Sequence, residues 1–331
     1  MPFDEAVALT AQHVDDLAKQ DLFAGVVLVA RGDKVILERA AGYSDREAKR
    51  PITLDTQFRM GSMNKMFTSV AILQLADQGK LSLDDTVGNH IPGYPAQDVA
   101  TKVKIRHLLT HSGGTGDIFG PEFFEKRLEL KTLDDYYRLY GARELDQEPG
   151  TSFRYSNYGY ILLGLIIEKA SGMSYYDYVR EKIFAPAGMT ATDSLPETES
   201  VPRRSVGYMR GDGQWKPNTD TLPWRGTSAG GGYSTARDLL KFALALQSEK
   251  LLSKQKLAEA SKARMGNYGF GFRTDGQGAL RRYGHNGSAP GMNGELRIYP
   301  ESGFVVVVLS NLDPPAATNI ASFLDLRISG S

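Results

Sequence analysis

The 331-residue chain contains no cysteine, which excludes disulfide bonds, thiolate metal sites and a cysteine nucleophile. It also has no net charge, because Lys plus Arg and Asp plus Glu both total 39. A neutral balance gives no support for nucleic acid or an anionic membrane as the main partner. Long apolar runs are missing as well, since the stretches 161–167 and 304–309 are far too short to span a bilayer.

The N-terminal stretch MPFDEAVALTAQHV does not read as a signal peptide. It has no basic region and no long apolar segment, and Asp4 and Glu5 come early. We therefore expect a soluble protein, cytoplasmic as the sequence stands and periplasmic or secreted if a leader has been removed. These features leave the oligomeric state open.

Strand patterns occur at both ends of the chain, and helical patterns fill the middle. Residues 4–20 have the spacing of an amphipathic helix, and two β-branched runs within 25–42 predict a hairpin. Strand signals return at 279–287, 294–300 and 304–312, followed by a helix at 316–328. Helices are also predicted at 64–79, 121–140, 158–171, 174–184 and 235–248.

This distribution predicts a mixed α/β (α+β) fold in which one antiparallel sheet is built from both termini and covered by the terminal helices. We expect a single domain over 1–331, with an α/β part at about 1–52 and 266–331 and a mainly helical part at about 53–265. Small-molecule sites commonly lie in a cleft between two such parts.

The stretch GSMNKMFTSVAILQLADQGK at 61–80 begins with a serine and a lysine three residues apart. In a helix these positions share a face, so Lys65 can reach Ser62 and accept its proton. The spacing alone has an ordinary explanation, because a serine at a helix start often caps the helix. A second copy, Ser253 to Lys256, lies in a highly charged stretch and reads as such a cap. The run after Lys65 is instead apolar on nearly all sides, and burial would lower the lysine pKa.

Two further motifs supply polar groups. Tyr155-Ser156-Asn157 lies on a polar loop before an apolar helix, where Tyr155 would relay a proton and Asn157 would bind a substrate amide or hold the lysine. Taken alone, this motif equally describes a turn that enters a helix.

The second motif, His285-Asn286-Gly287, follows a short strand. Gly287 would let a substrate approach the backbone closely, and His285 would supply a hydrogen-bond donor or a switchable charge. The amide N–H groups of Ser288 and Ser62 would form an oxyanion hole. Taken alone, the stretch also describes a glycine-rich hairpin loop with an exposed histidine.

In their order along the chain, the three motifs resemble those of the serine β-lactamase and penicillin-binding protein superfamily. The Tyr-x-Asn variant points to its class C-like branch, which includes family VIII carboxylesterases, DD-carboxypeptidases and D-aminopeptidases. The resemblance extends over most of the chain, since similar blocks recur in that branch at 78–95, 105–114, 148–160, 181–189, 229–242 and 284–294.

This resemblance implies that Ser62 is the acylated nucleophile and that Lys65 and Tyr155 form the acid–base pair, with the base undecided between them. Asn157 is implied to position other groups, and the Ser288 N–H to bind the oxyanion. His285 and Gly287 stand where many relatives have Lys-Thr-Gly, and a neutral imidazole binds an anion more weakly than an ammonium does.

That departure favours a carboxylesterase acting on short-acyl esters, with slight β-lactam hydrolysis. The alternatives are a D-amino-acid peptidase or DD-carboxypeptidase, a class C-like β-lactamase and, from another class, a non-hydrolysing penicillin-binding sensor. The expected partner is a small ester, amide or β-lactam. An apolar acyl pocket would draw on aromatic residues near the motifs and on the loops 115–130 and 210–230; those residues are Phe119, Tyr158, Trp215 and Trp224.

His107 and His111, in IRHLLTHSGG, are interpreted as structural caps at a helix end and a tight glycine turn. The chain has no HExxH motif and no cluster of acidic residues with histidine, so we predict no metal and no cofactor.

Overall fold

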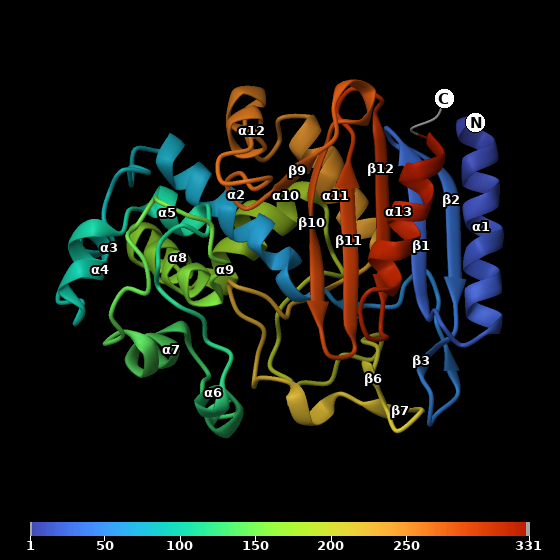
Figure 1. Cartoon of the computed structure of the whole chain (residues 1–331), viewed down its shortest axis with the longest axis horizontal. Coiled ribbons are helices and arrows are strands. Elements are labelled where there is room, and N and C mark those ends of the chain that lie inside the picture. Colours follow the sequence, from blue (N-terminus) through green and yellow to red (C-terminus); the bar gives the residue numbers. More distant parts are fainter. Residues whose placement is uncertain (1, 329–331) are drawn as a thin grey trace.

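A six-stranded antiparallel sheet divides the molecule into two layers in the computed structural model, which describes residues 2–328 (Figure 1). The strand order is β2-β1-β12-β11-β10-β9, so strands from the two ends of the chain meet in the middle of the sheet. Val27 of β1 lies opposite Val308 of β12. The bounds are β1 (Gly25–Arg31), β2 (Lys34–Ala41), β9 (Arg273–Asp275), β10 (Arg282–Ala289), β11 (Met292–Ile298) and β12 (Phe304–Ser310).

The terminal helices α1 (Phe3–Lys19) and α13 (Ala316–Ile328) cover one face of this sheet (Figure 1). Side chains alternate between faces along a strand, so Val27 packs under these helices and Leu28 packs on the opposite side. This arrangement confirms the predicted fold, with a sheet from both termini, terminal helices and a helical insertion.

The inserted region covers the other face of the sheet. Its central helices, α2 and α8, are apolar on all sides and lie in the core. No helix within residues 2–328 is long and apolar enough to cross a membrane. The helices of this region are α2 (Asn64–Asp77), α3 (Val87–His90), α4 (Gln97–Lys102), α5 (Ile105–Leu109), α6 (Pro121–Lys126), α7 (Leu133–Tyr140), α8 (Asn157–Ser171), α9 (Tyr175–Val179), α10 (Ala185–Ala187), α11 (Ala236–Gln247) and α12 (Lys254–Ala260).

The helix predicted at 121–140 is two helices in the structure, because Thr132 starts a new one. Its hydroxyl accepts a hydrogen bond from the backbone N–H of Asp135, as in a capping box. Short strands and helical turns complete the fold, namely β3 (Tyr43–Asp45) with β4 (Arg50–Pro51), β5 (Phe58–Arg59) with β8 (Tyr233–Ser234), β6 (Tyr208–Gly211) with β7 (Gln214–Pro217), η2 (Arg180–Phe184), η3 (Thr219–Thr221) and η4 (Gly278–Leu280).

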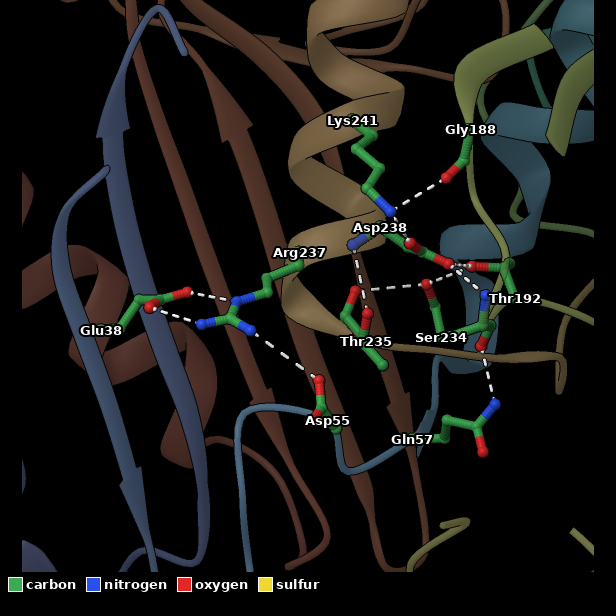
Figure 2. A network of polar contacts seen from close by, with 11 residues as sticks. Glu38, Asp55, Gln57, Gly188, Thr192, Ser234, Thr235, Arg237, Asp238 and Lys241 are labelled. Atoms are coloured by element: carbon green, nitrogen blue, oxygen red, sulfur yellow. Dashed lines mark hydrogen bonds and ion pairs between the residues drawn. The ribbon is translucent and has the colours of Figure 1, made fainter. Parts of the chain in front are cut away.

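A buried carboxylate anchors α11 beside these short strands (Figure 2). Asp238 is 2% exposed and accepts hydrogen bonds from the Ala191 N–H at 2.7 Å, the Thr192 hydroxyl at 2.9 Å and the Lys241 ammonium at 2.9 Å. On the same helix, Arg237 forms two hydrogen bonds with Glu38 of β2. These contacts fix α11 against β2 and against residues 191–192, where the Thr192 hydroxyl also hydrogen-bonds with that of Ser234 in β8.

We predict that Asp238→Ala lowers the free energy of unfolding by about 2–4 kcal/mol, because it leaves buried donors without an acceptor. The exposed Asp98, which pairs with Lys102 on the surface of α4, is a matched control. Its replacement by Ala should change stability by at most about 0.5 kcal/mol. Urea unfolding of both variants measures the difference, and equal effects would show that the buried network contributes little.

Candidate active site

Ser62 lies in a tight turn, η1 (Gly61–Met63), directly ahead of the buried helix α2. Its hydroxyl does not cap that helix, since α2 has no side-chain cap. In the second Ser-x-x-Lys copy, by contrast, the Ser253 hydroxyl accepts a hydrogen bond from the Lys256 N–H and caps α12. The structure therefore separates the two copies as their sequence contexts predict.

The amine of Lys65 is surrounded by oxygen atoms in the core of the protein, and its side chain is 0% exposed. The Nζ atom lies 3.2 Å from Ser62 Oγ, 2.8 Å from Asn157 Oδ1 and 2.5 Å from the Ala229 carbonyl oxygen. The second contact joins two motifs, since Lys65 and Asn157 are 92 residues apart in sequence. The third comes from the glycine-rich loop that precedes β8.

Burial lowers the pKa of Lys65 to about 7, and the nearby Arg273 guanidinium contributes in the same direction. The carboxylate of Asp117 opposes the shift, because a negative charge favours the ammonium form. A substantial fraction of the Lys65 side chains is thus neutral near pH 7, as a serine-activating base requires.

Asn157 begins helix α8 and is oriented by Asp117. The Asp117 carboxylate accepts hydrogen bonds from the Asn157 amide nitrogen Nδ2, at 2.9 and 3.2 Å, and from its backbone N–H at 3.2 Å. With Nδ2 directed at a carboxylate, Oδ1 must face Lys65. Of the two roles predicted for Asn157, the structure supports holding the lysine.

Tyr155 lies against the same amine, with Lys65 Nζ 4.7 Å from the centre of its ring. Burial raises the pKa of Tyr155, and a hydrogen bond with the Ser62 side chain only partly offsets that effect. The phenol therefore keeps its proton at neutral pH. The structure brings Ser62, Lys65, Tyr155 and Asn157 together as one cluster.

Gly287 and Ser288 of β10 lie beside the turn that carries Ser62. A Cβ atom on Gly287 would stand 1.8 Å from the Met60 carbonyl oxygen, so only glycine allows this close approach. The glycine thus accommodates the protein's own backbone, where the sequence had indicated room for a substrate. A Cβ atom on Gly61 would lie 3.2 Å from the Ser288 nitrogen, which places that N–H next to the serine turn.

His285 is buried rather than exposed, and both of its ring nitrogens are occupied. Nδ1 donates to the Asn286 carbonyl oxygen at 2.6 Å, and Nε2 therefore accepts from the Tyr268 hydroxyl at 2.8 Å. Burial, together with Lys65, lowers the pKa of His285 to about 3. The expected switchable charge is thus absent, because the ring stays neutral at physiological pH.

A cavity of about 290 Å³ opens beside Ser62. Its wall includes Asn157 and Ser288, but the remainder is largely apolar. Of the four aromatic residues expected in an acyl pocket, Phe119 alone lines it, whereas Tyr158, Trp215 and Trp224 lie elsewhere. The apolar part of the wall consists of Ile118, Phe119, Phe123, Phe124, Tyr136, Pro223, Ala229, Ala289, Pro290 and Met292.

Comparison with known proteins identifies the family. Residues 10–326 match the protein family described as Beta-lactamase. The chain belongs to this family. Penicillin-binding protein 4* of Bacillus subtilis (strain 168) is 31% identical over 319 residues, which cover 90% of this chain and 70% of that protein.

Solved structures of similar proteins confirm the β-lactamase fold. A penicillin-binding protein from Bacillus halodurans has a TM-score of 0.86 at 30% identity, over 96% of this chain and 98% of that one. EstCE1, described as a hydrolase with promiscuous acyltransferase activity, has a TM-score of 0.81 at 26% identity, over 97% and 98%. Members of the β-lactamase family are typically serine hydrolases. Membership of the family therefore indicates the class of reaction but not the substrate.

Three groups near Lys65 could not be recognised from the sequence as parts of this β-lactamase-family site. The Ala229 carbonyl is a backbone atom, so its residue type gives no indication of a role. Asp117 and Arg273 are charged residues that belong to none of the three motifs. The Nε atom of Arg273 is buried and makes no hydrogen bond within residues 2–328. Folding alone brings these groups near the amine.

We predict that Asp117→Asn shifts the activation of Ser62 to lower pH. Asp117 raises the pKa of Lys65, so its removal lets the amine lose its proton earlier. In the unmodified protein, the rate of Ser62 labelling by a fluorophosphonate should rise through pH of about 7. In the variant, the midpoint should fall by roughly half a pH unit or more.

Asp212→Asn is the control, because Asp212 is an exposed carboxylate on the β6–β7 hairpin that pairs with Lys216. Its pH profile should match that of the unmodified protein. An unchanged midpoint in Asp117→Asn would show that this carboxylate does not tune the lysine.

Proposed function

We propose that the protein hydrolyses carboxylic esters with short acyl groups through an acyl-enzyme on Ser62, with slight β-lactam hydrolysis as a side activity. The observation that carries this proposal is the set of three oxygen atoms around Lys65 Nζ. Two of them, Asn157 Oδ1 and the Ala229 carbonyl, can only accept hydrogen bonds. The third, Ser62 Oγ, can also donate.

A neutral amine has two N–H groups and one lone pair. The two carbonyl oxygens take both N–H groups of Lys65, so the lone pair is directed at the Ser62 hydroxyl. This geometry supports Lys65 as the base that removes the Ser62 proton. The raised pKa of Tyr155 argues against the phenolate as the base, because little of it forms at neutral pH.

The proposed reaction has two stages, acylation of Ser62 and hydrolysis of the acyl-enzyme. Ser62 Oγ attacks the ester carbonyl carbon while its proton passes to Lys65, and the oxyanion is stabilised by the N–H groups of Ser62 and Ser288. The bond to the alcohol then breaks, and Tyr155 donates its proton to the departing oxygen. The proton held by Lys65 restores the tyrosine, and water hydrolyses the acyl-enzyme by the same steps to release the acid.

The shape and charge of the site support an uncharged acyl group. The cavity beside Ser62 is walled mainly by apolar side chains, which favour a hydrocarbon acyl chain. The neutral ring of His285 offers no cation to a carboxylate at the position where Lys-Thr-Gly relatives have an ammonium. Both features favour esters over substrates that carry a free carboxylate next to the reacting bond.

Arg273 favours a second candidate, a D-amino-acid peptidase or DD-carboxypeptidase. Its charge acts on Lys65 and Tyr155, and its Nε has no hydrogen-bond partner among the described residues. A guanidinium with free donors is suited to a carboxylate. The penicillin-binding relatives are consistent with this candidate. Rates on esters, nitrocefin and D-alanyl peptides, together with intact-mass analysis after addition of penicillin, distinguish a class C-like β-lactamase and a non-hydrolysing sensor from these two candidates.

We predict that Ser62→Ala loses at least about 1,000-fold in kcat/KM on p-nitrophenyl butyrate, because the nucleophile is gone. Ser253→Ala removes the serine of the second Ser-x-x-Lys copy and should keep full activity. It should lose only about 1 kcal/mol of stability, since Ser253 caps a helix. The measurements are initial rates on p-nitrophenyl esters, nitrocefin and D-alanyl peptides.

Full activity in Ser62→Ala would refute the proposed mechanism. A higher kcat/KM on a D-alanyl peptide than on any ester would favour the peptidase, and fast nitrocefin turnover would favour the β-lactamase. Intact-mass analysis after addition of penicillin tests the sensor. A stable adduct together with no turnover of any substrate would show that the protein is a penicillin-binding sensor and not a hydrolase.

We also predict that Phe124→Ala weakens selection for the acyl chain. Phe124 lines the cavity and is 49% exposed, so its truncation should leave the fold intact. The loss of about 1 kcal/mol of apolar contact corresponds to roughly 5-fold in kcat/KM on p-nitrophenyl butyrate, with a smaller change on the acetate. Leu128→Ala is the control, because Leu128 is similarly exposed but does not line the cavity. A parallel fall on both esters in Phe124→Ala would exclude it from acyl recognition.

A further inference from the structure

His111 is a buried residue that the proposed reaction does not use. It is 1% exposed and lies just after α5 at the start of a glycine-rich loop. Its backbone has a φ of +55°, a left-handed conformation that side chains with a Cβ rarely adopt. Its Nε2 atom is buried and has no hydrogen-bond partner within residues 2–328. A buried nitrogen without a partner costs stability, so the unpaired Nε2 does not favour a histidine here on grounds of stability.

The contacts of His111 converge on the tripeptide that contains Tyr155. Its carbonyl oxygen accepts a hydrogen bond from the Arg154 N–H at 2.7 Å. Its ring atom Nδ1 accepts one from the Ser156 N–H at 3.1 Å. Its ring also lies against the Tyr155 ring, with 4.1 Å between the centres and 31° between the planes. One residue therefore holds Tyr155 by the backbone on both sides and by its ring.

The hydrogen bond from Ser156 also fixes the form of the imidazole. An Nδ1 atom that accepts a backbone N–H carries a lone pair, so the proton of the neutral ring is on Nε2. Protonation of Nδ1 would set one donor against another. His111 can thus hold this loop only as a neutral ring, and it makes no contact with the Ser62 oxygen.

We propose that His111 is a positioning residue for Tyr155, which it holds at hydrogen-bonding distance from Ser62 by accepting the Ser156 N–H and by stacking on the phenol ring. This inference rests on the proposed function, in which Tyr155 protonates the departing oxygen. A misplacement of about 1 Å in a catalytic group commonly costs about 100-fold in rate. The sequence predicted only a structural cap for His111, and the proposal adds a role in the reaction. His107 caps α5 as predicted, because its Nδ1 accepts a hydrogen bond from the Lys104 N–H.

The dependence on the leaving group separates positioning from simple stability. A nitrophenolate departs without a proton, whereas an alkoxide needs one from Tyr155. Two substitutions separate the hydrogen bond of His111 to Ser156 from its ring contact with Tyr155. Asn can accept the Ser156 N–H through its side-chain oxygen and tolerates a positive φ, whereas Phe keeps a ring but has no acceptor.

We expect His111→Phe to lose about 100-fold in kcat/KM on ethyl butyrate but at most about 10-fold in kcat/KM on p-nitrophenyl butyrate, because kcat/KM reports acylation, the stage in which the leaving group of the ester departs. His111→Asn should stay within about 5-fold of the unmodified protein on both esters. His107→Asn is the matched control, because its Nδ1 also accepts a backbone N–H, from Lys104 and not from a neighbour of Tyr155. That variant should keep the kinetics of the unmodified protein on both esters.

Tyr155→Phe separates failure of this inference from failure of the proposed function. If Tyr155→Phe shows no leaving-group dependence, the role proposed for the tyrosine is wrong. If it shows that dependence and His111→Phe does not, or if His111→Asn is as impaired as His111→Phe, the positioning role alone is wrong.

Hydrogen exchange at the Ser156 amide reports the same contact without any substrate. It should be at least about 10-fold faster in His111→Phe than in His111→Asn. Equal exchange in the two variants would overturn the proposal even if the protein cleaved no ester.

Discussion

The candidate active site depends on one constraint, the burial of the Lys65 amine in the core, where water does not reach it. Water would stabilise the ammonium form, and its exclusion from Lys65 brings the pKa to about 7. Two carbonyl oxygens accept hydrogen bonds from this amine, and in the proposed reaction its remaining lone pair faces the Ser62 hydroxyl. The core that surrounds α2 is therefore part of the chemistry, because a more open packing would return the amine to its ordinary charge.

Burial of the Lys65 amine also requires the site to form where the inserted helical region packs on the sheet. Ser62 comes from the turn η1, Lys65 from the start of α2, Asn157 from the start of α8, and the Ser288 N–H from the end of β10. The turn η1 packs against β10 so closely that glycine is required at position 287. Helix α11, held by its buried carboxylate at residues 191–192, follows β8, which pairs with the strand β5 that leads into that turn.

A single loop, 111–117, holds the Tyr155-Ser156-Asn157 motif in place. His111 binds the backbone on both sides of the tyrosine, and Asp117 fixes the orientation of the Asn157 amide. Between them, the hydroxyl of Thr115 lies 3.1 Å from that of Ser156. Every one of these contacts is a hydrogen bond between segments that are distant in sequence, so this loop fixes the geometry of the motif.

Sequence alone predicted the fold and the polar residues Ser62, Lys65, Tyr155 and Asn157, which the structure brings together. Hydrophobic periodicity depends on neighbouring residues, so the hairpin at 25–42, the closing strands and the apolar helix after Lys65 were predictable. Tertiary structure decided the rest, because orientation and charge depend on groups far away in sequence. It turned the ring of His285 toward Tyr268, directed the Ala229 carbonyl at the lysine and brought Asp117 to Asn157. None of these contacts follows a local period, since each forms only when separate segments pack together.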